Sequence, residues 1–359
     1  MKELVTLPGC AQMGFNLSPL VVKRELTLDE LRGKKLAVDA NNMLYQFLAL
    51  IRMRDGRPFT DSTGHITSHL LGLLLRTTRL IADYGILPVF VFDGKPPDLK
   101  IRTLEARRGY RERARKEWEA AVSRGDYPTA WSKAVTMNSL TRAMADDAKI
   151  VLALLGVPRV QAPQEAEAEA AHMAIRGDVW AANSRDYDSV LFGSPRLVRY
   201  MTISGQEFLP SKGIARPLIP ELIELEKLLD SLQITRQQLV DLAILVGTDF
   251  NRGIKGVGPK TALRLIKEHR SLEGLPEIYR NNLPENVDVL REIFLTPVVA
   301  NEYYIRFGEL NPEGLRHFLC EERSFSPEKV ELAIRRMQEF HGRDHSTLKH
   351  WMKDDSEGS

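Results

Sequence analysis

The chain has 359 residues, with 50 Lys and Arg against 48 Asp and Glu, so its formal net charge is +2. This length allows two domains, and the charge excludes a uniformly polybasic chain, so any nucleic-acid-binding surface must be local. Two cysteines are too few for a disulfide framework, no apolar run reaches the roughly 18 residues of a membrane span, and no secretory signal is evident. We therefore expect a cytoplasmic protein without membrane association.

Short apolar strands alternate with helical segments over the first half of the chain. The pattern predicts strands at 35–38, 87–92 and 179–183, each running into an acidic residue, and helices at 67–83 and 137–155. This alternation predicts an α/β fold with a mostly parallel central sheet and helices on both faces. The carboxyl ends of such strands share one edge, where ligands gather.

Helical patterns dominate from about residue 235 onward. A glycine-rich turn at 253–258 precedes a predicted helix at 261–269, and Pro259 suits a first helical turn. Glycines let a backbone come close to a phosphate, and the free N–H groups of a helix start bind anions. The pattern predicts a helix-hairpin-helix that grips a duplex backbone without reading sequence, although a plain interhelical turn is the simpler alternative.

Seven acidic residues lie at the ends of predicted strands or at turns and helix starts. Carboxylates that converge repel one another and stay ionised together only if cations neutralise them. Oxygen ligands suit Mg²⁺ or Mn²⁺ rather than Zn²⁺, and two such ions about 4 Å apart would activate water for phosphodiester hydrolysis. The seven candidate metal ligands are Asp39, Asp93, Glu165, Glu167, Asp186, Asp188 and Asp249.

Other interpretations of these acids stay open. A single acid after a strand is more often a helix cap or a solvated turn residue than a ligand. If the segment 186–188 is extended, its two aspartates point the same way. Glu169 and His172 have the Glu-x-x-His spacing of a di-iron bundle, but the second copy that such a bundle needs is missing from the sequence.

A basic segment follows Asp93 directly. Between Lys95 and Lys116, nine Lys and Arg residues stand against three acids. A one-signed excess beside a predicted metal site favours phosphate binding, although most charge runs are solvated helix faces.

These motifs together resemble the flap endonuclease family of structure-specific 5′ nucleases, most nearly its archaeal branch. The resemblance extends from Met13 onward and rests on the segments 37–40, 91–97, 162–167, 185–195 and 246–249. It implies a PIN-like nuclease core that holds two Mg²⁺ ions through all seven acids. It also implies a monomer that acts on nucleoid DNA and cuts 5′ flaps in branched DNA, with associated 5′–3′ exonuclease activity, during replication and repair.

The resemblance also assigns individual residues. Lys100 and Arg107 fall on the two basic catalytic positions of a helical arch that passes the 5′ strand, where they would steer the scissile phosphate. Tyr45 matches an aromatic on which a displaced base stacks, with core packing as the alternative. The remaining candidate DNA contacts are Arg76, Arg79, Gly256, Gly258 and Lys260.

Four parts are expected on this basis: an N-terminal extension at 1–12, a nuclease core at 13–234 with the arch at about 95–140, a helix-hairpin-helix DNA-binding region at 235–341, and a flexible tail at 342–359. The family begins Met-Gly, which here is Met13-Gly14, so we expect Met13 to be the true start. The tail occupies the place of a sliding-clamp (PCNA) binding motif. Leu348 and Trp351 fit that motif, whereas His345 and Met352 depart from it, which predicts weakened clamp binding.

Two functional alternatives differ from flap cleavage. A related nuclease of the same superfamily would act mainly as a 5′ exonuclease or on RNA. A non-catalytic protein that binds DNA junctions would keep the fold, and we would expect it to lack some of the seven acids, all of which are present.

Overall fold

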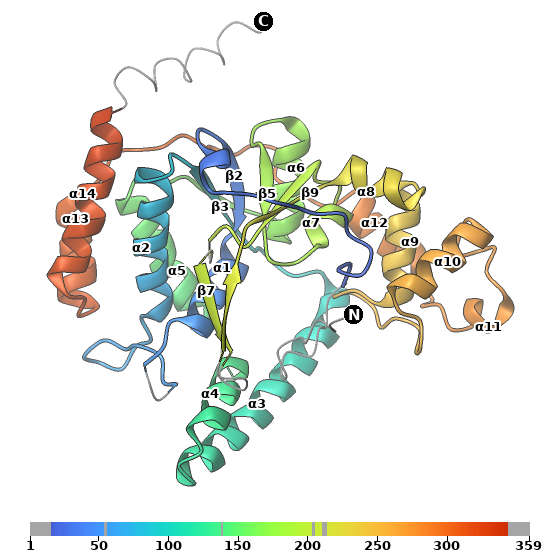
Figure 1. The fold of residues 1–359 in the computed structure, drawn as a ribbon, viewed down its shortest axis with the longest axis horizontal. Helices are drawn as coiled ribbons and strands as arrows, with labels where there is room; N and C mark the ends of the chain where they lie inside the picture. The colour runs from blue at the N-terminus through green and yellow to red at the C-terminus, as the bar shows by residue number, and fades with distance from the viewer. Residues whose placement is uncertain (1–15, 54–55, 138, 203–204, 210–213, 344–359) are drawn as a thin grey trace, which may run out of the picture.

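A seven-stranded sheet with helices on both faces forms the centre of the computed structural model, which describes residues 16–53, 56–137, 139–202, 205–209 and 214–343 (Figure 1). The strand order is β1-β9-β6-β5-β2-β3-β4. The five strands from β6 to β4 run parallel, and β9 and β1 add an antiparallel edge. The predicted fold class, a mostly parallel α/β sheet, is confirmed.

The strands are short, as buried parallel strands usually are. Their bounds are β1 Arg24–Glu25, β2 Lys35–Asp39, β3 Leu87–Phe92, β4 Arg159–Gln161, β5 Ala181–Asn183, β6 Arg196–Arg199, β7 Gly205–Leu209, β8 Ile214–Leu218 and β9 Glu221–Glu224. The last strand predicted, 179–183, is reduced to β5, and the separate antiparallel hairpin of β7 and β8 was not predicted.

Helices follow most of the strands. Their bounds are α1 Ala40–Leu50, α2 Ser68–Ala82, α3 Ile101–Ser123, α4 Tyr127–Thr136, α5 Arg142–Leu154, α6 Ala166–Arg176, α7 Asp188–Leu191, α8 Leu225–Leu232, α9 Arg236–Val246, α10 Pro259–His269, α11 Glu277–Arg280, α12 Val287–Leu295, α13 Pro312–Arg316 and α14 Pro327–Arg343. The predicted helix at 137–155 starts only at Arg142, because the Thr141 hydroxyl accepts the backbone N–H of Met144 and caps a new helix there.

Two hydrophobic clusters lie on opposite faces of the sheet. Successive side chains of a strand point to opposite faces, so Leu36 and Val38 of β2 pack with α1, α2 and α5, whereas Ala37 packs with α6, α7 and α9. This double burial explains why the central strands read as continuous apolar runs.

The region predicted as a helix-hairpin-helix at 235–341 occupies two places. Helices α9, α10 and α12 pack together beside α7 at one end of the molecule, whereas α13 and α14 lie at the opposite end, against α5 and α2 (Figure 1). Within the described chain, none of the helices has the length and apolar character needed to cross a bilayer. The predicted extension at 1–12, Met13, and the clamp-motif residues Leu348, Trp351 and Met352 lie outside the described residues.

Candidate metal and phosphate site

The acids that follow β2 and β3 meet at the carboxyl edge of the sheet. Asp39 ends β2 and caps α1, where its carboxylate accepts the backbone N–H of Asn42 at 2.9 Å. Asp93 accepts the Asn41 side-chain amide and the backbone N–H of Ala166, each at 2.8 Å. Asp93 therefore ties the start of α1 to the start of α6.

The remaining acids come to the same edge from helix starts and turns. Glu165 is the N-cap residue of α6, as the Pro163 pattern predicted, and Glu167 lies in its first turn. Asp188 is the first residue of α7, and Asp249 follows α9 at a turn where Gly247 has a φ of 106°. The topology thus gathers side chains from segments more than 200 residues apart.

The segment 186–188 is not extended, so the condition under which its spacing would point both aspartates the same way is not met. Tyr187 has helical backbone angles, with φ −98° and ψ −2°, because α7 begins immediately after it. Asp186 is exposed and accepts the Asn42 side-chain amide at 2.6 Å, whereas Asp188 is buried. The two carboxylates reach the site from a loop and from a helix start.

Burial and mutual repulsion raise the pKa of three of these carboxyl groups. Burial, and then the charge of Asp93, raises the pKa of Asp39 well above its usual range. Burial and the charge of Asp188 do the same to the pKa of Glu167, and burial and the charge of Asp249 do the same to the pKa of Asp188. Without added cations the site favours protonated carboxyl groups.

Two bases of the predicted arch supply part of the missing positive charge. The Lys100 ammonium donates to Glu165 and lies 3.6 Å from Asp249, and Arg107 donates to Asp249 at 2.6 and 2.8 Å. Burial lowers the pKa of Lys100, but the charges of Glu165 and Asp249 raise it above its usual value. Both bases are therefore fully charged at the edge of the carboxylate cluster.

The donor set fits hard divalent cations. All seven acids offer oxygen ligands, and Glu167 Oε1 is buried without a hydrogen-bond partner in the described part of the chain. In those described residues, no three Asp, Glu, His or Cys side chains are yet arranged as ligands of one ion, which agrees with Lys100 and Arg107 standing among the carboxylates.

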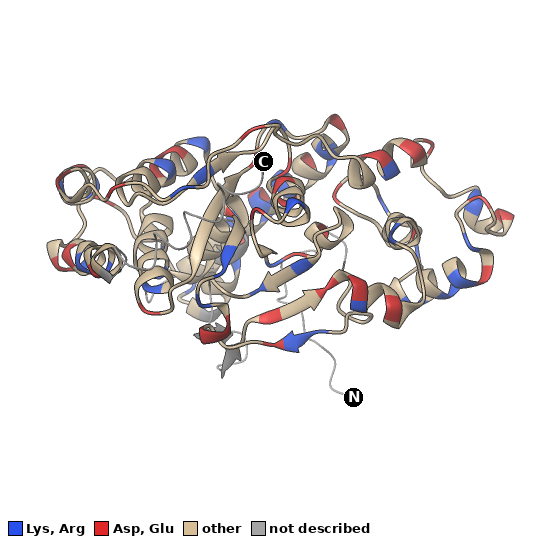
Figure 2. Ribbon diagram, turned by 90° about the horizontal axis from the view of Figure 1, so that it is seen from above, with Lys and Arg blue, Asp and Glu red and all other residues tan. Residues whose placement is uncertain are grey.

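The basic segment forms a helix that projects from the core. Helices α3 and α4 pack on each other and extend away from the sheet as a pair (Figure 1). Most of the basic side chains of α3, including Arg102, Arg108 and Arg113, are exposed, and its buried side chains are Ala114 and Ala121. On the helices that Figure 2 shows from above, Lys and Arg are interspersed with Asp and Glu.

The predicted DNA-contact residues Tyr45, Arg76 and Arg79 lie on α1 and α2, with Arg79 in the last turn of α2 before β3 begins. Tyr45 is half-buried on α1, which is compatible with either stacking or core packing. Arg79 is exposed and donates to the Tyr84 hydroxyl at 3.1 Å, whereas Arg76 is half-buried.

The glycine-rich turn before α10 is open to a ligand. Gly256 has a φ of 83°, and a Cβ atom built on Gly256 or Gly258 would meet nothing within 4 Å. Gly258 caps α10 without a side-chain hydrogen bond, so the first N–H groups of the helix are available to an anion, and Lys260 is exposed beside them. Buried Val257 anchors the turn between them.

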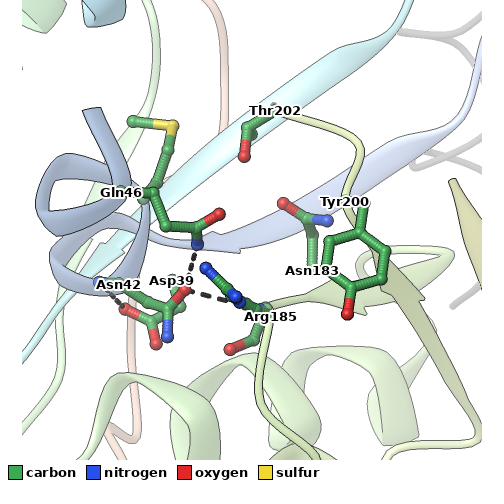
Figure 3. A pocket seen from close by; sticks show the side chains of 9 residues that line it. Asp39, Asn42, Gln46, Asn183, Arg185, Tyr200 and Thr202 are labelled. Carbon is green, nitrogen blue, oxygen red and sulfur yellow. Dashed lines mark hydrogen bonds between the residues drawn. The ribbon is translucent and has the colours of Figure 1, made fainter. Parts of the chain in front are cut away.

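Polar side chains that sequence reasoning missed organise the acids. The Asn41 and Asn42 side-chain amides donate to Asp93 and Asp186, and the Gln46 side-chain amide donates to the side-chain oxygen Oδ1 of Asn42. Figure 3 shows Gln46 and Arg185 facing each other beside Asp39, in a small hollow that Tyr200 borders. The positions of Asn41, Asn42 and Gln46 in the first turns of α1, directly after Asp39, were the signal in the sequence that could have identified them.

Comparison with known proteins identifies the type of fold. Residues 14–114 match the XPG N-terminal domain and residues 156–249 the XPG I-region, and these two ranges contain all seven acids. The solved flap endonuclease-1 of Methanococcus jannaschii superposes with a TM-score of 0.72 at 34% identity, covering 92% of this chain and 100% of that one. The catalytic core of Rad2 in complex with DNA substrate shares the fold, with a TM-score of 0.65 at 23% identity, covering 88% of this chain and 96% of that one. The fold and the matched domains define a structure-specific nuclease.

Similar proteins of known name show which family of structure-specific nucleases the chain belongs to. Flap endonuclease 1 of Pyrococcus horikoshii is 46% identical over 344 residues, covering 94% of this chain and 98% of that protein. Flap endonuclease 1 of Methanosarcina acetivorans is 44% identical over 339 residues, covering 94% of this chain and 100% of that protein. The chain belongs to the flap endonuclease 1 family, which confirms the resemblance and makes it a hydrolase that acts as a structure-specific 5′ nuclease of metal-dependent type.

The repulsion among the carboxylates predicts that the cation-free site costs stability. When the pKa of a carboxyl is higher in the folded protein than in the unfolded chain, the folded protein becomes less stable as the pH rises above the ordinary pKa of that carboxyl. We expect Asp188→Asn to raise the melting temperature of the metal-free protein near pH 8 by about 2–4 °C for each kcal/mol gained. The gain should shrink as the pH falls, because the raised pKa of Asp188 lets this carboxyl protonate in the parent. Calorimetry in a chelator measures both effects.

Asp147→Asn is the matched control for this substitution. Asp147 lies outside the site and accepts two hydrogen bonds from Arg323, at 3.0 and 2.9 Å, so its replacement should lower the melting temperature. A lower melting temperature for Asp188→Asn near pH 8 would contradict the electrostatic account.

Proposed function

We propose that this chain removes 5′ flaps from branched DNA by hydrolysing one phosphodiester bond near the single-strand/duplex junction. Associated 5′–3′ exonuclease activity would follow from the same site. The observation that carries the proposal is the gathering of seven carboxylates at the base of a basic arch, with Lys100 and Arg107 reaching the same carboxylates. Such a site serves DNA replication and repair. The protein would act as a cytoplasmic monomer on nucleoid DNA.

Two Mg²⁺ ions, with Mn²⁺ as a substitute, are the cations that the oxygen-only ligand set suits best. When bound, they supply a nucleophile at neutral pH and stabilise the leaving oxygen. The ligands we propose are the seven acids, with Asn41 and Asn42 orienting Asp93 and Asp186 through their amides.

Lys100 and Arg107 would bind the scissile phosphate once cations neutralise the carboxylates. Each already lies at the edge of the site, so a short movement of its side chain would aim it at a phosphate oxygen. Their fixed positive charges would stabilise the charge that develops on the phosphate during hydrolysis.

Residues beyond the cluster would hold the DNA. The open turn at Gly256 and Gly258, together with Lys260, would bind the duplex backbone, while Arg76 and Arg79 would contact the strands near the junction. Tyr45 would stack on a displaced base. The expected division into a nuclease core at 13–234 and a DNA-binding region at 235–341 fits this arrangement for α9 and α10, although α13 and α14 return to the core.

A substrate panel tests the proposal. Cleavage of a 5′ flap, a blunt duplex and single-stranded RNA of matched sequence is compared in Mg²⁺ and in a chelator. The expected result is Mg²⁺-dependent endonucleolytic release of the flap as the fastest reaction. Faster stepwise degradation of the blunt duplex or of the RNA would favour the related exonuclease or ribonuclease instead, and flap binding without any cleavage would favour a non-catalytic junction-binding protein.

The C-terminal tail is proposed to bind a sliding clamp (PCNA). Leu348, Trp351 and Met352 form its degenerate motif, and because Met352 replaces an aromatic we expect a dissociation constant in the micromolar range or weaker. Calorimetric titration of the archaeal clamp with the tail peptide measures it. A Met352→Phe peptide should bind more tightly, and no binding of either peptide up to millimolar concentration would reject the proposal.

A further inference from the structure

Arg199 is a buried arginine at the end of β6, against the segment 184–188 that carries two of the proposed ligands. Its side chain is 8% exposed. Nε donates to the backbone carbonyl of Arg185 at 2.8 Å, Nη1 donates to the Tyr187 hydroxyl at 2.7 Å, and Nη2 donates to the Tyr200 hydroxyl at 2.9 Å. Each of its three nitrogens is therefore committed to the segment or to its immediate border.

The guanidinium also lies close to two aromatic rings. Its central carbon lies 4.1 Å from the centre of the Tyr187 ring and 4.7 Å from that of the Tyr200 ring. Glu221 of β9 accepts a further bond from Nη1 at 3.2 Å and balances the charge. A buried, paired and stacked arginine holds its neighbours in one geometry, because any movement would leave a desolvated charge without a partner.

Arg199 is one of several contacts that hold this segment. Residues 184–187 link β5 to α7, and Asp188 begins α7. From α1, the Asn42 side chain donates to Asp186 at 2.6 Å and accepts the backbone N–H of Arg185 at 3.4 Å. From β6, Arg199 holds the Arg185 carbonyl and the Tyr187 hydroxyl. Together these contacts would keep both aspartates aimed at the site.

We propose that Arg199 is a positioning residue for the metal site: it touches no reacting group, but it sets the distance of Asp186 and Asp188 from the other carboxylates. The inference rests on the proposed function, because it takes these two aspartates as ligands. The tyrosines share the role, since the Tyr187 hydroxyl links the guanidinium to Ser18 at 2.9 Å. Outer contacts of this kind tune metal affinity by about 10–100-fold in other sites.

Mn²⁺ binding to the full-length protein without DNA tests the proposal, with electron paramagnetic resonance as the readout. Arg199→Met should weaken binding about tenfold or more, and Arg199→Lys should restore part of it, since lysine keeps the charge but loses the fork of donors. Cleavage by Arg199→Met should recover at high Mn²⁺ concentration. Arg196→Met is the matched control on the same strand, because Arg196 packs on Trp180 instead, and it should bind Mn²⁺ as the parent does.

Parent-like Mn²⁺ affinity in folded Arg199→Met would overturn the proposal. If that variant does not fold, Tyr187→Phe removes one hydroxyl alone and should still weaken Mn²⁺ binding several-fold; unchanged binding in it would also overturn the proposal. Asp188→Ala distinguishes a wrongly assigned metal site from a wrongly assigned role of Arg199. If it binds Mn²⁺ like the parent, the proposed metal site itself is wrong, whereas loss of binding in Asp188→Ala with parent-like binding in Arg199→Met rejects the role of Arg199 alone.

Discussion

Asp188→Ala is expected to reduce flap cleavage about a thousandfold or more and to leave flap binding within a few-fold of the parent. Asp188 is buried among the carboxylates, and its charge is coupled to those of Asp249 and Asp186. Losing it should remove several kcal/mol of transition-state stabilisation, and about 4 kcal/mol corresponds to about a thousandfold in rate. Asp186→Ala should behave similarly, because the DNA is held mainly through its backbone by other residues.

Single-turnover cleavage and equilibrium binding of one flap substrate measure the two effects separately. Glu331→Ala is a suitable control, because Glu331 is a half-exposed acid on α14 that pairs with Arg316 of α13, and it should cleave as the parent does. Cleavage that survives in Asp188→Ala or Asp186→Ala would show that the site is wrongly assigned.

Lys100→Ala and Arg107→Ala should each lower the single-turnover rate by about 10²–10³-fold, the range found when one donor to a developing negative charge is removed. Lys100 bridges toward Glu165 and Asp249, and Arg107 forms two bonds to Asp249. Because both bases also neutralise the carboxylates, their loss should tighten the binding of divalent cations while it slows cleavage. Tighter cation binding together with slower cleavage distinguishes Lys100 and Arg107 from the seven acids.

Arg115→Ala provides the control within the same helix. Arg115 is an exposed base of α3 that pairs with Glu119, so its loss should change cleavage only through weaker contact with the DNA phosphate backbone. Equal losses of rate in Arg115→Ala and Arg107→Ala would contradict a specific role for the base that reaches Asp249.

The sequence predicted three of the strands, β2, β3 and β5, and singled out the seven acids as candidates, because both steps depend on local pattern. Asp39 and Asp93 follow apolar runs that could only be buried strands, and parallel strands place their ends together. Pro163 marked the start of α6 and so the position of Glu165. The side-chain roles assigned to these acids came from family resemblance, and they stay predictions.

Other features depend on contacts between distant segments, which local pattern does not carry. The grip of Arg199 on the Arg185 carbonyl requires β6 and the loop after β5 to be adjacent. The return of α14 to α2 depends on an apolar face that would suit many partners. The conformation of the segment 186–188 was left open, because α7 begins there without a capping side chain that would mark it.

Anomalous diffraction from Mn²⁺-soaked crystals tests the central claim, that the seven carboxylates form one two-ion site, most directly. We predict two peaks about 4 Å apart among these carboxylates, with Lys100 and Arg107 displaced from Glu165 and Asp249. No peak at the carboxyl edge of the sheet, or ions bound only elsewhere, would contradict the account.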